Sequence, residues 1–201
     1  MTIFKQGWPL NNTSRKQAAL KPRLQGFRVL LKAPEEKDYQ EWALVRAKNQ
    51  EFLTPYEPQW AEDCLTNAYF KRRLARQDEE YRAGRGCYFL IHHRRSGDII
   101  GGINLNNIQM GAACFASLGY WIDSDYQGQG YMKEAAALVI DYAFNTLHLK
   151  RLNAGSLPHN ARSIGLLKSL GFEEEGYAKK YLQINGAWQD HVLFGLIPKQ
   201  E

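Results

Sequence analysis

The stretch YQGQGYM, residues 126–132, places two glycines and two glutamines directly before an apolar, helix-forming segment. Beyond it, apolar side chains recur at helical spacing, which predicts a helix to about His148 with one core face. That face comprises Met132, Ala136, Val139, Ile140, Ala143, Phe144 and Leu147. The side chains expected to point away from it are Lys133, Glu134, Asp141 and Asn145. The segment is therefore predicted to be a strand end, a tight glycine-rich turn and a helix start.

The glycines of this turn point to an anion-binding site. A helix start carries unpaired backbone N–H groups and the positive end of the helix dipole, which together attract phosphate. Because glycine has no Cβ, a diphosphate can lie close to the amides of residues 128–132. A Walker A loop is absent from the sequence, and Lys133 interrupts the dinucleotide pattern G-x-G-x-x-G. A plain strand-to-helix turn is the alternative that the glycines alone leave open.

On the N-terminal side of the turn, the residue pattern predicts two helices followed by an antiparallel meander. Tyr39, Trp42, Ala43 and Val45 would give the first helix its apolar face. Two prolines then break this helix and leave aromatic side chains in a loop. In chain order the segments are a strand at 27–34, a helix at 35–53, a loop at 54–60, a helix at 64–84 and strands at 87–93, 98–108 and 114–122.

On the C-terminal side of the turn, the pattern predicts a strand at 150–157, a helix at 160–170 and a terminal hairpin. Gly171 would end the helix at its C′ position. Asn185-Gly186 between two β-rich runs is a strong hairpin signal. This order of elements predicts a mixed α/β (α+β) domain around one central sheet.

The composition agrees with one compact globular domain. The chain has 201 residues, of which 44% are hydrophobic and 23% are charged, so disorder and a coiled coil are disfavoured. We expect the domain at residues 23–198, after a polar N-terminal extension at residues 1–22. No apolar run reaches the ~18 residues of a membrane span, and the first residues lack the apolar core of a secretory signal.

The cysteines indicate the redox environment of the protein, and the net charge indicates which partners it can attract. Cys64, Cys87 and Cys114 are widely spaced and form no C-x-x-C pair, which predicts reduced thiols rather than disulfides or zinc ligands. We therefore expect a cytoplasmic protein without a metal site and without a membrane partner. The net charge of +5 permits an acidic or nucleic-acid partner without requiring one.

The segment Gln127-Gly128-Gln129-Gly130 resembles the Q/R-x-x-G-x-G/A motif of GNAT-fold N-acetyltransferases. The resemblance implies that the loop amides bind the pyrophosphate of acetyl-CoA, the cosubstrate. The implied loop residues are Gln127, Gly128, Gln129, Gly130, Tyr131 and Met132. Met132 departs from the glycine or alanine usual at the sixth position, which is tolerable if only its amide is used. The element order also matches the GNAT fold, a mixed and mostly antiparallel sheet flanked by helices, over residues 23–198.

Three further blocks resemble the RimJ branch of this family, the ribosomal-protein alanine N-acetyltransferases. They are NQEFLTPYEP at 49–58, the stretch at 158–182, and WQDHVL at 188–193. The resemblance implies acetyl transfer to the N-terminal alanine of a ribosomal protein, with contact to the ribosome or a pre-ribosome. Two alternatives stay open, which are acetylation of a small amine such as a polyamine or aminoglycoside, and a ribosome-assembly factor that binds RNA. A monomer and a dimer are both compatible with the sequence.

The family resemblance also implies roles for residues outside the glycine turn. The preceding strand would run beside the pantetheine arm of the cosubstrate through the backbone of Tyr120, Trp121 and Ile122, even if both aromatic side chains pack in the core. Asn160 and Ser163 resemble an N-x-x-S element, in which the Asn binds the pantetheine amides and the Ser protonates the leaving thiolate. The alternative makes Asn160 a helix N-cap and Ser163 a first-turn residue.

Acetyl transfer also needs a neutral amine, held in line, and a proton for the thiolate. Many GNAT enzymes place a tyrosine acid four residues after the serine, where this chain has Leu167, which leaves Ser163 or a water. Glu57 is the candidate for binding or deprotonating the amine, with an exposed loop carboxylate as the alternative. The wall of the acceptor groove is expected at Tyr56, Glu57 and the turn at 185–186.

Overall fold

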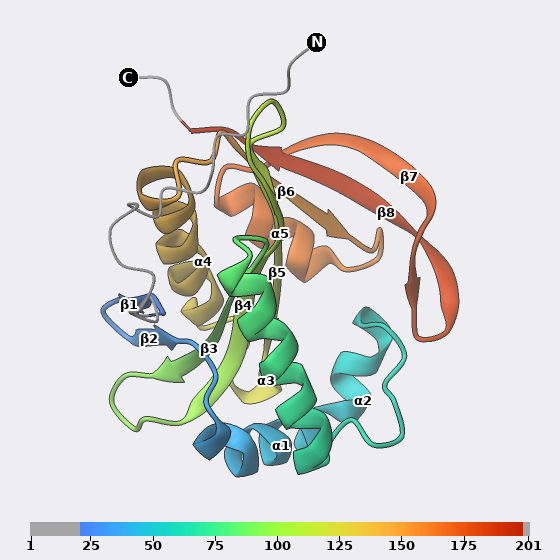
Figure 1. The fold of residues 1–201 in the computed structure, drawn as a ribbon. Coiled ribbons are helices and arrows are strands. Elements are labelled where there is room, and N and C mark those ends of the chain that lie inside the picture. The colour runs from blue at the N-terminus through green and yellow to red at the C-terminus, as the bar shows by residue number, and fades with distance from the viewer. Residues whose placement is uncertain (1–20, 199–201) are drawn as a thin grey trace.

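The computed structural model describes residues 21–198, so the predicted extension at residues 1–22 lies almost wholly outside the described residues. Within residues 21–198, eight strands form one sheet in the order β1-β2-β3-β4-β5-β6-β8-β7 (Figure 1). They are β1 (Arg23–Gln25), β2 (Val29–Lys32), β3 (Cys87–His93), β4 (Ile99–Gln109), β5 (Phe115–Ile122), β6 (Arg151–Ser156), β7 (Glu173–Ile184) and β8 (Ala187–Leu196). Only β5 and β6 pair in parallel, so the mixed, mostly antiparallel sheet is confirmed.

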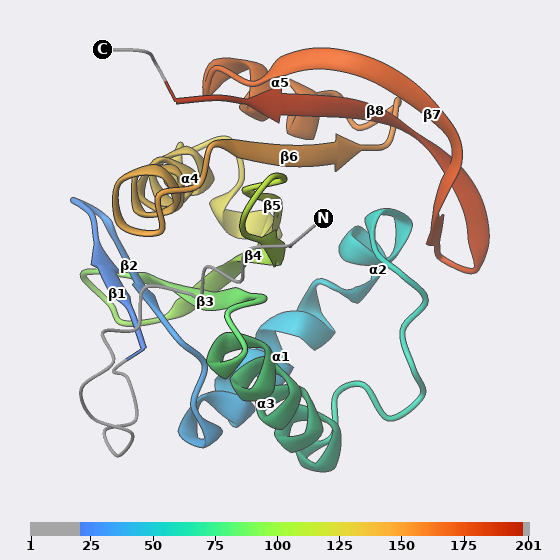
Figure 2. The same cartoon turned by 45° about the horizontal axis from the view of Figure 1, so that its top comes forward.

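The described helices cover both faces of this sheet. They are α1 (Tyr39–Lys48), α2 (Gln50–Leu53), α3 (Asn67–Arg82), α4 (Tyr131–Asp141) and α5 (Ala161–Ser169). A π-helical turn, Tyr142–Thr146, extends α4, and short 3₁₀ turns lie at Glu36–Asp38, Thr54–Tyr56 and Ser124–Tyr126. In Figure 2, α1 and α3 lie on one side of β3 and β4, and α4 lies on the other side.

Alternation along the strands divides the core into two apolar clusters. Successive side chains of a strand point to opposite faces of the sheet. In β3, Phe89 and Ile91 join the cluster that includes side chains of α4 and α5. Leu90 between them joins Trp42 of α1 and Phe70 of α3 on the other face. Because full burial of one such side chain stabilises the fold by about 1.5–3 kcal/mol, both helix layers are held firmly.

The sheet opens between its two parallel strands. β5 and β6 pair only where Phe115–Ser117 lies beside Arg151–Asn153. Beyond this register β5 continues to Ile122, where it pairs only with β4, and β6 continues toward α5 with β8 as its partner. From residue 118 onward, one edge of the β5 backbone therefore has no strand of the described chain paired with it.

The predicted single helix at 35–53 is wrong as one continuous element. The helix ends at Asn49 and resumes as the short α2. Asn49 is fully buried, and its side chain donates to the carbonyl of Val45 and to Asp123 of a distant loop. This tertiary contact interrupts the helix at a residue that no local pattern marks as a break.

Other elements agree with their sequence signals more closely. Asn185 and Gly186 both have positive φ, 45° and 80°, as a two-residue hairpin turn requires, and the predicted hairpin is confirmed. Gly171, with φ of 90°, follows α5 as predicted. The second helix begins at residue 67 rather than 64, because the Thr66 hydroxyl caps it by accepting from the Tyr69 N–H. The three-residue strand β1 was not predicted, since it is too short to show a period.

Two further observations complete the fold. None of the helices between residues 21 and 198 is long and apolar enough to cross a bilayer. Cys64, Cys87 and Cys114 are free cysteines, and burial raises the pKa of Cys87 to about 12, so its thiol stays protonated.

Candidate active site

The glycine turn has the backbone that its sequence predicts. Gly128 and Gly130 have φ values of 68° and 83°, in the left-handed region that side chains with a Cβ rarely adopt. Gly130 is the residue before α4, so the free amides of the first helical turn follow it directly. The turn and the helix start therefore present backbone donors in the arrangement that suits a phosphate.

Arg28 fastens this turn to the N-terminal part of the sheet. Its Nη1 donates to the Gln129 carbonyl oxygen at 2.9 Å, and its Nε donates to the Glu134 carboxylate at 2.9 Å. The Arg28 N–H also donates to Glu134, at 2.7 Å. Glu134 was expected to point away from the apolar face of the helix, and its carboxylate is half-buried against Arg28. Burial raises the pKa of Glu134, but the hydrogen bonds from Arg28 outweigh this effect and lower it.

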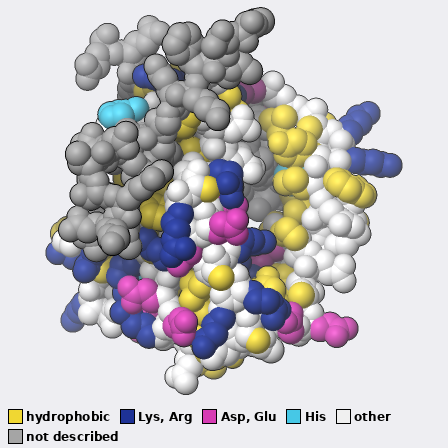
Figure 3. All heavy atoms as spheres, viewed as in Figure 1, with side chains coloured by type: hydrophobic (Ala, Val, Ile, Leu, Met, Phe, Trp, Pro, Cys, Tyr) yellow, Lys and Arg dark blue, Asp and Glu magenta, His cyan; other side chains and the backbone are white. Residues whose placement is uncertain are grey.

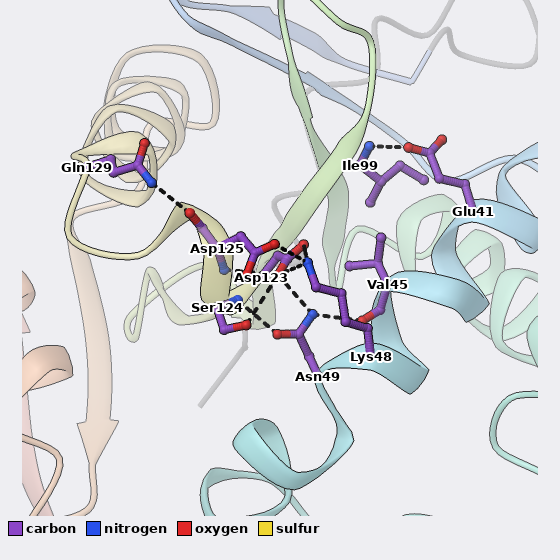
Figure 4. Close-up of polar contacts among 9 residues, drawn as sticks. All are labelled: Glu41, Val45, Lys48, Asn49, Ile99, Asp123, Ser124, Asp125 and Gln129. Carbon is purple, nitrogen blue, oxygen red and sulfur yellow. Dashed lines mark hydrogen bonds and ion pairs between the residues drawn. The ribbon is translucent and has the colours of Figure 1, made fainter.

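A buried carboxylate holds the segment that leads into the turn (Figure 4). Asp123 is 3% exposed and accepts from Asn49 Nδ2 at 3.0 Å, from Lys48 Nζ at 3.0 Å and from the Asp125 N–H at 3.1 Å. Asn49 in turn accepts from the Ser124 N–H at 2.8 Å. Although burial raises the pKa of Asp123, these hydrogen bonds together lower it, so the group stays ionised at neutral pH. The network ties the end of β5 to the end of α1.

A cavity of about 400 Å³ opens beside the glycine turn. Its walls come from the end of β5, the turn with the start of α4, the start of α5 and the segment around α2. Of the predicted site residues, those lining it are Glu57, Tyr120, Trp121, Ile122, Gln127, Gly128, Gly130, Met132, Asn160 and Ser163. The fold thus brings together residues that lie more than a hundred positions apart in the sequence.

Two predicted loop residues do not line this cavity. The Gln129 side chain donates to the Asp125 carbonyl at 2.6 Å and so braces the turn from within (Figure 4). The Tyr131 ring packs against His93 and Tyr126, and the Arg28 guanidinium lies 4.7 Å from its centroid. Both side chains therefore brace the turn, and neither residue lines the cavity.

A pair of hydroxyl groups lies where β5 diverges from β6. The hydroxyl groups of Tyr120 and Ser163 are 2.8 Å apart, although 43 positions separate these residues in the chain. Burial raises the pKa of Tyr120, and the hydrogen bond with Ser163 offsets only part of this rise, so the phenol stays protonated. Leu167, at the position where a tyrosine acid was considered, is fully buried in the core. The tyrosine of this site comes instead from β5, which sequence spacing alone did not reveal.

Asn160 caps α5, as the alternative interpretation of its sequence predicts. Its side-chain oxygen accepts from the Ser163 N–H at 3.1 Å. The N-cap role occupies the oxygen and leaves the side-chain NH₂ group as a donor on a residue that lines the cavity. Capping and ligand binding are therefore compatible at this position.

Glu57 lies at the cavity edge with its carboxylate already bound. Arg46 donates through both of its terminal nitrogens, one at 2.7 Å, and Trp60 Nε1 donates at 2.8 Å. The Arg46 guanidinium also stacks over Trp60 and Trp121, at 4.3 and 5.0 Å from their ring centroids. Three donors on one carboxylate favour a positioning role in the loop, and the catalytic role of Glu57 stays a prediction.

The residues predicted to wall the acceptor groove lie together. The Asn185 N–H at the hairpin tip donates to the Glu57 carbonyl at 2.9 Å, so β7 and β8 are anchored on the loop after α2. A second cavity, of about 920 Å³, lies beneath this hairpin and shares Tyr56, Tyr120 and Ser163 with the first. The hydroxyl pair is thus reachable from the glycine-turn side and from the hairpin side.

The arrangement suits a reaction between two substrates that enter from different sides. Backbone amides at a helix start would hold a diphosphate, and the free edge of β5 offers hydrogen bonds to an extended amide-bearing arm. The hydroxyl pair stands where the two cavities meet. The described residues contain no cluster of His, Cys, Asp or Glu suited to a metal ion.

Comparison with known proteins identifies the family. The model of the acetyltransferase (GNAT) domain matches residues 28–173. The [ribosomal protein uS5]-alanine N-acetyltransferase of Escherichia coli K12 is 39% identical over 176 residues, which cover 88% of this chain and 91% of that protein.

Solved structures agree with this assignment. The ribosomal-protein-S5-alanine acetyltransferase of Vibrio fischeri superposes with a TM-score of 0.82 at 33% identity, over 88% of this chain and 97% of that one. Mycobacterium smegmatis RimJ, in complex with CoA-disulfide, gives a TM-score of 0.80 at 31% identity over 84% and 81% of the two chains. The expected GNAT fold is therefore confirmed, and the chain belongs to the GNAT family of acetyl-CoA-dependent N-acetyltransferases.

Proposed function

We propose that this protein transfers the acetyl group of acetyl-CoA to the N-terminal α-amine of a ribosomal protein that begins with alanine. The observation that carries the proposal is the 39% identity to a uS5-alanine N-acetyltransferase over nearly the whole of both chains. Because the match covers 88% of this chain, it extends well beyond the glycine turn.

In this proposal the cosubstrate lies along the first cavity. The amides of residues 128–132 hold its diphosphate, as the left-handed φ values at Gly128 and Gly130 allow. The pantetheine arm follows the backbone of Tyr120, Trp121 and Ile122, where β5 has left β6. The Asn160 side chain donates to the arm from the opposite wall.

Acetyl transfer to an α-amine does not require a strong general base. An α-amine has a reference pKa of roughly 8, against about 10.4 for a lysine side chain, so a useful fraction is neutral near pH 7. The amine attacks the thioester carbonyl, the new C–N bond forms, the C–S bond breaks, and the amine proton passes to water. We assign the proton for the departing thiolate to the Tyr120–Ser163 pair, since both hydroxyl groups border the cavity and lie 2.8 Å apart.

Glu57 takes a positioning role in this scheme. Its carboxylate binds Arg46 and Trp60, and its carbonyl binds the hairpin tip at Asn185. Together these contacts hold the loop and the hairpin at the entrance for the acceptor. Removing Glu57 would therefore disturb acceptor binding more than the chemical step.

The test uses a peptide that begins with free alanine and carries an internal lysine. Incubation with acetyl-CoA, followed by mass spectrometry with fragmentation, locates the acetyl group, and the same peptide with a blocked N-terminus is the control. We expect acetylation of the α-amine in the free peptide and none in the blocked one. Acetylation confined to the lysine, or activity only on polyamines or aminoglycosides, would contradict the proposal and favour the small-amine alternative.

We also propose that the enzyme meets its acceptor in the cytoplasm. The acceptor is then either a free ribosomal protein or one already assembled into the ribosome. The net charge of +5 supports attraction to ribosomal RNA. Sedimentation of the protein with ribosomes at low and at high salt tests this point. Co-sedimentation that weakens as salt rises is expected, and its absence at low salt would restrict the enzyme to free ribosomal proteins.

A further inference from the structure

A third cavity, which we call the acceptor-side pocket, lies between α1, α3 and the end of β5. It has a volume of about 430 Å³, and its walls include Trp42, Trp60, Tyr69, Arg73, Arg76 and Trp121. Tyr120 borders both this pocket and the cavity at the glycine turn. A chain whose amine lies near Tyr120 can therefore extend into the acceptor-side pocket.

Arg73 is the unusual group of this pocket. It is half-buried on α3, yet it forms no hydrogen bond or ion pair with any residue from 21 to 198. Burial and then the nearby Arg46 charge lower its pKa, although a guanidinium stays protonated in proteins. A partly desolvated cation without a partner destabilises the fold, so its place at a pocket wall calls for a ligand.

Two nearby arginines, Arg46 and Arg72, differ from Arg73 in having acidic partners. Arg46 is bound to Glu57. On the face shown in Figure 3, basic and acidic side chains intermix over α1 and α3, and the adjacent Arg72 pairs with Asp63. Arg76 lies one turn beyond Arg73 and so on the same side of α3, and it too has no ion pair within the described chain. The pocket therefore offers two uncommitted cations.

We propose that Arg73, assisted by Arg76, binds a carboxylate within the first few residues of the acceptor peptide. The inference rests on the proposed N-terminal acetylation and adds a preference for an acidic side chain. An extended peptide advances about 3.3 Å per residue, so a side chain a few positions after the reacting amine reaches this pocket. The planar guanidinium suits a carboxylate, and Trp42 and Tyr69 can pack against its aliphatic stem.

The same charges argue against cationic acceptors. Polyamines and aminoglycosides carry several positive charges, which two unpaired guanidinium groups would repel. A peptide with one acidic residue near its amine satisfies the pocket and presents a single amine at the thioester. The acceptor-side pocket thus favours a peptide over a polycation within the proposed function.

The experiment compares matched peptides that begin with alanine and carry Glu or Gln at one of positions two to five. The wild-type enzyme should show a kcat/KM at least about tenfold higher for Glu than for Gln at one of these positions, since only the carboxylate forms a charged hydrogen bond with the guanidinium. Arg73→Gln should reduce the ratio to about one. The neighbouring Arg72→Gln removes an equal charge from the exposed face of α3 and should leave the ratio unchanged.

Three results separate this inference from the proposed function. Equal rates for Glu and Gln at every position, in an enzyme that acetylates alanine peptides, would overturn the inference alone. An equal loss of selectivity in Arg72→Gln would also overturn it, because a general charge effect would then suffice. Failure to acetylate any alanine peptide would overturn the proposed function. If Arg73→Gln does not fold, the exposed Arg76→Gln carries the test, and an unchanged ratio there would contradict the inference.

Discussion

Two hydroxyl groups, on Tyr120 and Ser163, meet at the point where β5 leaves β6, and each has a different environment. Tyr120 packs against the larger apolar cluster, which keeps its phenol protonated. Ser163 lies in the first turn of α5, where the Asn160 cap fixes the backbone beneath it. A half-buried, protonated phenol that touches a serine hydroxyl is a suitable proton source for a thiolate.

Replacing Tyr120 by Phe should lower kcat about 10²-fold while leaving the KM for acetyl-CoA nearly unchanged, because a proton donor is lost and the backbone contacts stay. Ser163→Ala should have a smaller effect, since the phenol remains. The double variant should be no slower than Tyr120→Phe, as expected for groups that act as one unit. Steady-state kinetics at saturating peptide measures all three, and a Tyr120→Phe rate within about twofold of the parent would mean that another group supplies the proton.

The pH dependence of kcat/KM follows from the acceptor α-amine and from Tyr120. It should rise with pH up to the pKa of the acceptor α-amine, roughly 8, because only the neutral amine attacks. A proton donor is present below its own pKa, and burial raises the pKa of Tyr120 above the usual tyrosine value. No fall is therefore expected until above about pH 10. An alkaline limb near pH 8 or 9 would contradict Tyr120 as the donor.

At the scale of elements, the glycine turn is defined by two left-handed residues and by the groups that brace it. A Cβ at Gly128 would meet no atom within 4 Å, whereas one at Gly130 would lie 3.1 Å from Arg28. Gly128 is therefore the cleaner site for a substitution that perturbs only the ligand.

Gly128→Asp should weaken acetyl-CoA binding by at least about tenfold, because a carboxylate beside the amides repels a diphosphate. Gly111→Asp is the matched control. Gly111 also has positive φ, 93°, with open space at its Cβ position, so the backbone strain is similar. Titration calorimetry gives both dissociation constants, and unchanged affinity in a folded Gly128→Asp protein would remove the diphosphate from this turn.

The link from α1 to the turn should appear as pH-dependent stability. Asp123 has a lowered folded pKa, so it stabilises the fold above its unfolded pKa, about 3.9, and this contribution is lost as pH falls. Asp123→Asn should therefore destabilise the protein by about 1–3 kcal/mol at pH 7, and the difference from the parent should be smaller at about pH 3, below the unfolded pKa. The exposed Asp125→Asn should change stability by less than about 1 kcal/mol. Urea unfolding at both pH values measures these changes, and equal effects of the two substitutions would contradict the account.

At the scale of the whole molecule, local signals predicted the elements better than the contacts between them. Helical spacing, the Asn185-Gly186 turn and the glycines at 128 and 130 each act within a few residues, so their structures could be predicted. The break at Asn49 could not, because it depends on Asp123, 74 positions away.

The candidate site shows the same limit. The glycine turn could be predicted from its motif. The hydrogen-bond network around Asp123, which precedes the turn, has only the Asp-Ser-Asp run at 123–125 as a local sequence signal. The Tyr120–Ser163 contact exists only because β5 and β6 diverge at a particular register, which pairing between distant strands decides. Arg73 likewise reads as one arginine among several until the fold shows which of them have acidic partners.

The proposed activity is tested by locating the acetyl group on an intact ribosomal protein that begins with alanine. The purified acceptor is treated with acetyl-CoA and either the wild-type enzyme or Tyr120→Phe, and its N-terminal peptide is then fragmented in a mass spectrometer. We expect one acetyl group on the α-amine of the first alanine, formed about 10²-fold more slowly by the variant. An unmodified α-amine after prolonged reaction with an enzyme that binds acetyl-CoA, or acetyl groups found only on lysine side chains, would contradict it.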